Sequence, residues 1–194
     1  MTAPLDARIT RPREGGPSFP LSHRLERLAF AMTWSVINLL FPLPFHGLRR
    51  TILVLFGARL HATAKVYPSA MVWYPRNLVM DEFTCLGPDV NCYCMAPITI
   101  EAYALVSQGA HLCAGAHDID DPNLQLVVRP ITLARNSWVA AEAFMGPGSE
   151  LGEGAVLGAR AVLFGRLEPW TVAIGNPARV IRHRRKPDTQ WAPP

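Results

Sequence analysis

The sequence has little charge and no apolar stretch long enough to cross a membrane as a helix. Charged residues make up 18% of the 194 residues, hydrophobic residues make up 49%, and the formal net charge is only +4. This composition excludes a disordered chain and is typical of one or two globular domains. The most apolar stretch, residues 28–41, has fourteen residues and ends at Pro42, so it is too short for a spanning helix.

Three further absences narrow the class of protein. The four cysteines, Cys85, Cys92, Cys94 and Cys113, lack the CxxC spacing of redox and zinc motifs. The first residues, MTAPLDARITRPREGG, have no apolar segment behind a basic start, so we expect no secretory leader and a cytoplasmic location. The basic run RVIRHRRK, residues 179–186, has no interleaved aromatic residues, so we expect no nucleic-acid partner.

What the sequence does have is an aliphatic residue at every sixth position of LARNSWVAAEAFMGPGSELGEGAVLGARAVL, residues 133–163. These residues are Leu133, Val139, Met145, Leu151, Leu157 and Leu163. A helix would repeat every three or four residues and a half-buried strand every two. The first and fourth positions after each aliphatic residue are small in the middle of the run, as tight corners require. The pattern is typical of a hexapeptide β-helix, in which short strands alternate with such corners.

The period divides the chain into four regions. It starts near residue 58, shifts twice by two residues, and is interrupted at residues 113–131. We therefore expect a flexible tail (1–20), a helical region (21–57) that ends at Gly57, a β-helix (58–168) with an extruded loop (113–131), and a C-terminal segment (169–194). Insertions in a solenoid collect on one face, often the binding face, so the loop is where chemistry is expected.

The extruded loop contains AHDIDDP, which places His117 beside Asp118 and Asp120. An imidazole can exchange protons near neutral pH, so His117 is a candidate catalytic residue. The alternatives are a surface histidine and a solvated acidic turn.

The hexads, this loop and PWTVAIGNPARVIRHR (residues 169–184) together resemble the hexapeptide-repeat O-acetyltransferases, nearest to the colanic acid biosynthesis acetyltransferases. The resemblance covers residues 45–185. It implies a mainly β protein with a left-handed parallel β-helix that assembles as a homotrimer, with acetyl-CoA bound between neighbouring subunits and no metal required. It also implies an acyltransferase that acetylates a sugar hydroxyl.

The resemblance assigns the reacting groups. His117 matches the general base of similar enzymes, which take the proton from the acceptor hydroxyl in a direct transfer without an acyl-enzyme. Asp118 or Asp120 would orient the imidazole or the sugar, and the choice between them stays open. Trp138 would line the acceptor or thiol region, with a stacking role in the core as the alternative.

The resemblance also assigns the cofactor contacts. Ala140 and Ala141, and Ala159 one coil later, match positions where relatives let the pantetheine lie against the backbone. A backbone N–H near Ala140 or Ala141 would stabilise the oxyanion. Arg179 and Arg182 match basic residues near the CoA phosphates, which guanidinium groups suit.

Two departures bear on the acceptor. Sugar acetyltransferases of the maltose type have an Asn where this chain has Leu-Gly-Pro (86–88) and an acidic residue where it has Cys94. Both help to hold the sugar in those enzymes, so we expect an acceptor of exopolysaccharide or glycoconjugate assembly, which could be lipid-linked. Residues 28–50, with Trp34, Phe41, Phe45, Arg49 and Arg50, would either cover the end of the β-helix or lie on a membrane surface.

Two rival interpretations share the fold. A γ-carbonic-anhydrase-like protein would hold zinc with three histidines, and the six-residue spacing of His111 and His117 predicts equivalent positions in neighbouring strands, with His61 also available. The short-spaced second pair of that family is missing here. An inactive trimeric scaffold is the other rival, and the presence of His117 with Arg179 and Arg182 argues against it.

Overall fold

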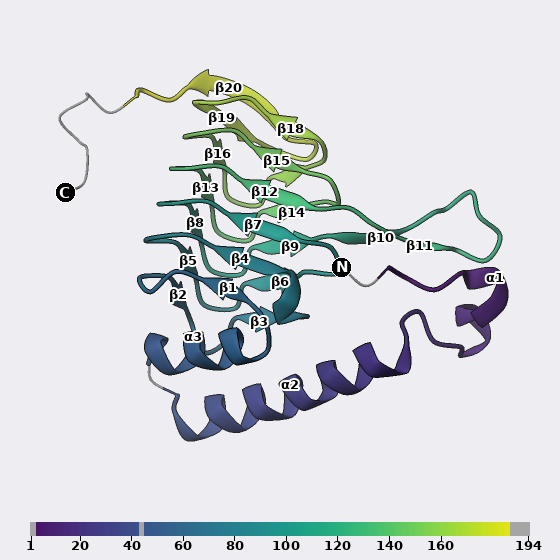
Figure 1. Cartoon of the computed structure of the whole chain (residues 1–194). Coiled ribbons are helices and arrows are strands. Elements are labelled where there is room, and N and C mark those ends of the chain that lie inside the picture. Colours follow the sequence, from purple (N-terminus) through teal and green to yellow (C-terminus); the bar gives the residue numbers. More distant parts are fainter. Residues whose placement is uncertain (1–2, 43–44, 187–194) are drawn as a thin grey trace.

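The chain forms a solenoid of stacked parallel strands with helices at its N-terminal end (Figure 1). The computed structural model describes residues 3–42 and 45–186. The predicted mainly β fold with an N-terminal helical region is confirmed. Within the described residues no helix is long and apolar enough to cross a membrane.

Each turn of the solenoid contributes one strand to each of three sheets. The first sheet contains β1 (Arg59–Leu60), β4 (Leu78–Met80), β7 (Ile98–Ile100), β12 (Ile131–Leu133), β15 (Glu150–Leu151) and β18 (Arg166–Leu167). The second contains β2 (Lys65–Val66), β5 (Cys85–Leu86), β8 (Leu105–Val106), β13 (Trp138–Val139), β16 (Val156–Leu157), β19 (Thr171–Ile174) and β20 (Arg179–His183). The third contains β3 (Met71–Val72), β6 (Asn91–Tyr93), β9 (His111–Cys113), β14 (Phe144–Met145) and β17 (Val162–Leu163).

The six-residue aliphatic repeat forms the core, as predicted. In the first sheet Leu133 aligns with Ile100 on one side and with Leu151 on the other. All six aliphatic residues of the 133–163 run are at most 5% exposed. Each buried side chain therefore packs on its counterparts in the adjacent turns, which makes every repeat depend on its neighbours.

The small residues after each aliphatic position allow the backbones of adjacent turns to approach closely. They are not needed for an unusual backbone conformation. A Cβ atom on Gly152 would lie 2.6 Å from the backbone nitrogen of Pro169 in the next turn. The left-handed backbone at the corners falls two positions later, for example at Asn136 (φ 60°) and Glu142 (φ 57°). Glycine is thus needed where adjacent turns approach most closely, whereas the left-handed position is occupied by glycine at some corners, such as Gly154 (φ 64°), and by other residues at the rest.

All insertions occur at the corner between the third and first sheets. Leu60 aligns with Met80 and Met80 with Ile100, so the first turns take twenty residues, whereas Leu133 aligns with Leu151 after eighteen. The expected loop at 113–131 leaves from the same corner as an antiparallel hairpin of β10 (Gly115–His117) and β11 (Leu126–Val128). Figure 1 shows this hairpin extending far from the solenoid.

The helical region covers the N-terminal end of the solenoid. Helices α2 (Leu21–Leu40) and α3 (His46–Leu55) lie within the expected helical region 21–57, and α3 ends before Gly57, whose φ of 94° suits a helix terminus. Trp34 is buried and donates from its indole nitrogen to the Ala70 carbonyl, 3.2 Å away. Arg49 is fully buried and donates to Asn38. Trp34 and Arg49 therefore face the protein, and the prediction that they could rest on a membrane is wrong for these two residues.

The N-terminal segment, expected to be a flexible tail, has defined structure from residue 3 onward. It contains α1 (Ala7–Thr10) and the 3-10 helix Pro12–Glu14. The Ala7 amide donates to the side chain of Gln125 on the hairpin at 2.7 Å, and Phe19 is 4% exposed. Burial of Phe19 and contacts with the hairpin offset the entropy cost of ordering this segment. The final part of the expected C-terminal segment, 187–194, lies outside the described residues.

Candidate active site

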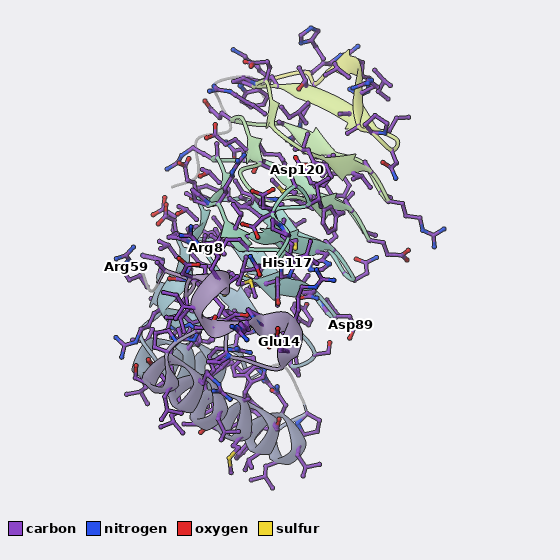
Figure 2. The ribbon with its side chains drawn as sticks, turned by 90° about the vertical axis from the view of Figure 1, so that its right-hand side faces the viewer. Arg8, Glu14, Arg59, Asp89, His117 and Asp120 are labelled. Carbon is purple, nitrogen blue, oxygen red and sulfur yellow. The ribbon has the colours of Figure 1, made fainter. Side chains whose placement is uncertain are left out.

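His117 ends β10, opposite Leu126 and next to the loop of the hairpin, and is exposed to solvent (Figure 2). Its Nδ1 lies 2.7 Å from the carbonyl oxygen of Leu124 across the hairpin. A carbonyl oxygen only accepts, so Nδ1 carries a proton in this contact. In the neutral ring the lone pair is then on Nε2. This arrangement makes Nε2 the basic atom and fixes the orientation of the ring.

The two neighbouring aspartates do not contact His117 through any hydrogen bond in the described part of the chain. Asp118 accepts from the Asp120 amide at 3.0 Å through its Oδ1, which shapes the hairpin loop, and Asp120 is exposed. The group that orients the imidazole is therefore the Leu124 carbonyl. Sequence reasoning missed it, because a backbone oxygen leaves no signal in a residue pattern.

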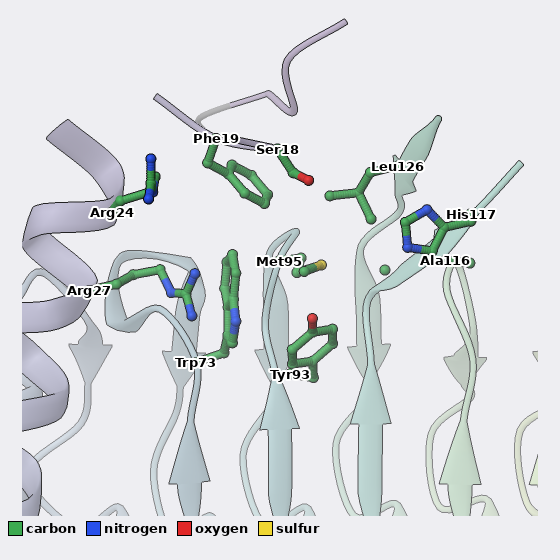
Figure 3. Close-up of a pocket in the computed structure, with 11 residues that line it drawn as sticks. Ser18, Phe19, Arg24, Arg27, Trp73, Tyr93, Met95, Ala116, His117 and Leu126 are labelled. Atoms are coloured by element: carbon green, nitrogen blue, oxygen red, sulfur yellow. The ribbon is translucent and has the colours of Figure 1, made fainter. Parts of the chain in front are cut away.

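A cavity of about 550 Å³ lies on one side of His117 (Figure 3). Its lining residues come from α2, the N-terminal segment, the third sheet and the hairpin: Ser18, Phe19, Arg24, Arg27, Trp73, Tyr93, Met95, Gly115, Ala116, His117 and Leu126. The volume is within the range of small-molecule sites. Trp73 follows β3 directly, Tyr93 ends β6 and Met95 lies two residues beyond it, so all three lie at the corner where the two-residue insertions occur. The shifts in the period were the signal that could have located them.

A second hollow, of about 370 Å³, lies on the other side of the histidine. It is lined by Ala116, His117, Asp118, Ile119, Val127, Arg129, Pro147 and Phe164. Ile119 is 85% exposed and Phe164 is 66% exposed. His117 thus stands between a polar cavity and an open surface that carries large apolar side chains.

The expected pantetheine contacts gather at a different corner. Ala140 and Ala141 follow β13, and Ala159 follows β16 one turn later, so all three lie between the second and third sheets. The Ala140 amide donates to Leu157, whereas the amides of Ala141 and Ala159 have no acceptor within the described residues. His117 leaves from the corner between the third and first sheets. Within one chain the histidine and these alanines are therefore not brought together.

Trp138 begins β13, beside the alanine corner, and is 40% exposed. Its indole nitrogen donates to the Ser107 hydroxyl at 2.8 Å. A core stacking role does not fit this exposure. The ring stays a candidate for lining a site on the surface of the second sheet.

Arg179 and Arg182 lie on β20, which pairs antiparallel with β19 at the C-terminal end of the second sheet. Both are exposed, and Arg179 aligns with Ile174. Ile174 also lies against Gly158, the residue before Ala159. The structure therefore brings Arg179 to the same corner as the alanines.

The histidines do not form the arrangement that the zinc alternative needs. His111 on β9 aligns with Asn91 and Phe144 of the adjacent turns, whereas His117 aligns with Leu126 inside the hairpin. Their predicted equivalence is wrong, because the chain leaves the solenoid after Cys113 and the six-residue spacing no longer stacks side chains. Residues 3–42 and 45–186 contain no group of three His, Cys, Asp or Glu residues that could hold a metal ion.

Comparison with solved structures finds the same architecture in several acetyltransferases. A hexapeptide-repeat-containing acetyltransferase of Vibrio cholerae, complexed with acetyl coenzyme A, superposes with a TM-score of 0.72 and 20% identity, covering 86% of this chain and 91% of that one. A galactoside acetyltransferase in complex with coenzyme A gives 0.70 and 20%, with coverages of 93% and 92%. A maltose O-acetyltransferase of Clostridium difficile gives 0.70 and 21%, with coverages of 86% and 90%. At these identities the likeness establishes the shared fold.

Comparison of sequences is more specific. No protein-family model matches the chain. The colanic acid biosynthesis acetyltransferase WcaF of Escherichia coli is 36% identical over 154 residues, which are 78% of this chain and 85% of WcaF, and WcaF of Shigella flexneri gives the same values. The protein is therefore an acyltransferase that belongs to the hexapeptide-repeat acetyltransferases, in the group of the colanic acid biosynthesis acetyltransferase WcaF.

Proposed function

We propose that the protein transfers an acetyl group from acetyl-CoA to a sugar hydroxyl in exopolysaccharide or glycoconjugate biosynthesis, with His117 as the general base. The observation that carries this proposal is the contact between His117 Nδ1 and the Leu124 carbonyl, which leaves Nε2 to accept a proton. The relationship to WcaF supports a carbohydrate acceptor.

The chemistry is a direct acyl transfer. As the acceptor oxygen attacks the thioester carbonyl, His117 Nε2 takes its proton, because an alcohol is a weak nucleophile at neutral pH. A new C–O bond forms, the carbonyl π electrons move to oxygen, and the C–S bond then breaks to release the CoA thiolate. The proton passes from Nε2 to the thiolate or to water. The free amide of Ala141 is suited to donate to the oxyanion, since the Ala140 amide is already bonded to Leu157.

The assembly that unites these groups is a homotrimer. The histidine and the alanine corner lie on different edges of one chain, so the hairpin of one subunit would bring His117 to the alanine corner of the next. The exposed Ile119 and Phe164 beside the histidine support a protein contact at this place. Light scattering should give three times the 21.4 kDa chain mass. A monomer at all concentrations contradicts the shared site.

The base assignment is tested by thiol release from acetyl-CoA with a panel of sugar acceptors. His117→Ala should lower the acceptor-dependent rate by about 10²–10⁴-fold, the usual contribution of a positioned base. His61→Ala, an exposed histidine on the solenoid outside the hairpin, is the matched control and should leave the rate unchanged. Equal rates for the two variants refute the assignment. No acceptor-dependent release from the wild-type protein would favour the inactive scaffold.

We place the reaction in the cytoplasm, at the membrane face, with a lipid bilayer against α2. Along its outer side run six aliphatic residues that are 53–81% exposed: Leu21, Leu25, Leu28, Met32, Val36 and Leu39. The only acidic residue of α2, Glu26, is bonded to Tyr74 and Arg76. The outer side thus carries apolar groups without a free carboxylate, and the exposed Arg24 lies next to it, which suits an anionic lipid surface. Figure 1 shows α2 as the outermost element at this end.

Flotation with vesicles of phosphatidylglycerol and phosphatidylcholine tests the membrane contact. Wild-type protein should float, Leu28→Glu and Met32→Glu should stay in the dense fraction, and Phe83→Glu, at an exposed apolar residue of the solenoid, should float. A wild-type protein that does not float contradicts the proposal. If two copies of the protein instead associate through α2, Leu28→Glu and Met32→Glu should have a lower molecular mass in solution than the wild-type protein. That result would assign this surface to a second chain.

A further inference from the structure

The cavity beside His117 contains two arginines that have no anionic partner in the described residues. Arg24 and Arg27 project from α2, three residues apart and therefore on the same side of the helix. Neither side chain forms an ion pair or a hydrogen bond to any described residue. None of the lining residues is Asp or Glu. The cavity therefore has a positive wall that no acidic side chain of residues 3–42 and 45–186 pairs with.

Arg27 is the more constrained of the two. Its guanidinium carbon lies 3.7 Å from the centre of the Trp73 ring, which holds it against one wall. Its Nε is buried and has no hydrogen-bond partner. Burial lowers the pKa of the Arg27 guanidinium, which stays charged because that pKa starts far above neutrality. A buried donor without a partner is costly in a folded protein and is often explained by a ligand.

The remaining walls fit a sugar. The half-buried Trp73, on whose ring Arg27 stacks, adds an aromatic wall, and the Tyr93 hydroxyl makes no hydrogen bond to the described residues. Burial raises the pKa of that hydroxyl, so it stays protonated and can donate. Figure 3 shows the two arginines at one end of the cavity and His117 at the other, with Tyr93 and Met95 between them. A bound molecule would span from an anion at the arginines to a hydroxyl at the histidine.

We infer that the acceptor is a diphosphate-linked sugar, whose diphosphate binds Arg27 and Arg24 while the sugar extends towards His117. This inference rests on the proposed function for the reaction at the sugar, but the anion site itself follows from the arginines. Two adjacent guanidinium groups match the several oxygens of a diphosphate. The same diphosphate chemistry occurs in nucleotide-linked and in lipid-linked sugars. Arg24 lies next to the apolar outer side of α2, which favours the lipid.

The test is equilibrium binding by calorimetry without acetyl-CoA, with uridine diphosphate and farnesyl diphosphate as probes. At least one diphosphate should bind, and Arg27→Gln should weaken it by about tenfold or more, the loss expected for a charge-assisted hydrogen bond. Arg27→Lys should recover part of the affinity, because it restores the charge but not the planar group. Arg59→Gln, at an exposed arginine that Figure 2 shows away from His117, is the matched control and should bind as the wild type does.

The relative affinities of the two probes distinguish a lipid-linked from a nucleotide-linked acceptor. Tighter binding of farnesyl diphosphate assigns the acceptor to a lipid, and tighter binding of uridine diphosphate assigns it to a nucleotide. If Arg27→Gln fails to fold, Arg24→Gln replaces it, since Arg24 is exposed and its loss leaves no cavity. No binding of either diphosphate, or binding that both arginine variants retain, overturns the inference. This binding experiment contains no acetyl-CoA, so its result is independent of the base assignment. Diphosphate binding can be absent while His117-dependent thiol release persists, and it can be present although His117→Ala leaves thiol release unchanged.

Discussion

Truncation of Phe19 should release the N-terminal segment from the hairpin without unfolding the solenoid. Phe19 is 4% exposed, stacks on His23 at 4.5 Å between ring centres and packs with Met95 and Leu126. It is the largest buried side chain of the segment, which is also held by the buried Ala7, whose amide donates to the Gln125 side chain at 2.7 Å.

The magnitude follows from the burial. Replacing a buried Phe with Ala costs about 3–5 kcal/mol, and the lower end applies because this cluster lies at the edge of the fold and can partly collapse. At about 1.4 kcal/mol for each factor of ten, a loss of about 3 kcal/mol raises the population of the released segment by about 10²-fold. The free energy of unfolding of the solenoid should change far less, since the main core does not include Phe19.

Amide hydrogen exchange of the peptides that cover residues 5–18 measures this release. The amides of Leu5 and Ala7 are hydrogen-bonded, so Phe19→Ala should speed their exchange by about 10²-fold, the rise calculated for the released population. Ile9→Ala, at a side chain that is 79% exposed, is the control and should leave exchange unchanged. Equal exchange in the two variants would show that Phe19 does not hold the segment, and the account of the defined N-terminal structure would be wrong.

Two further predictions test the core and the buried histidine. Leu133→Ala should lower the free energy of unfolding by about 3–5 kcal/mol, because three buried carbons are lost and turns on both sides limit collapse. The outward-facing Thr132→Ala should change it by less than about 0.5 kcal/mol, and equal urea midpoints at one protein concentration would contradict the stacked core. Burial lowers the pKa of His23, so folding favours its neutral form; this stabilisation is complete above pH of about 6.5 and is lost as the pH falls below that value. Melting temperatures between pH 7.5 and 5.5 should therefore fall less in His23→Gln than in the wild type, and an unchanged slope would exclude this effect.

The sequence determined the solenoid and its core. An aliphatic residue every sixth position can be buried only if the chain turns after each short strand, so the period defined the fold and the buried positions, among them Leu133, Met145 and Leu151. The break in the period located the hairpin and the candidate base His117. The helical region over residues 21–57 was also predicted from the sequence.

Tertiary structure alone decided how the site is built. Trp73, Tyr93 and Gly115 are about twenty residues apart in sequence, and they line one cavity because successive turns place their insertions at the same corner. The packing of α2 on the end of the solenoid brings Arg27 to that corner, and no local pattern encodes where a helix docks. The Leu124 carbonyl that orients His117 comes from the opposite strand of the hairpin. Periodicity reports which side chains are buried, whereas the contacts of a site depend on how distant segments meet in space.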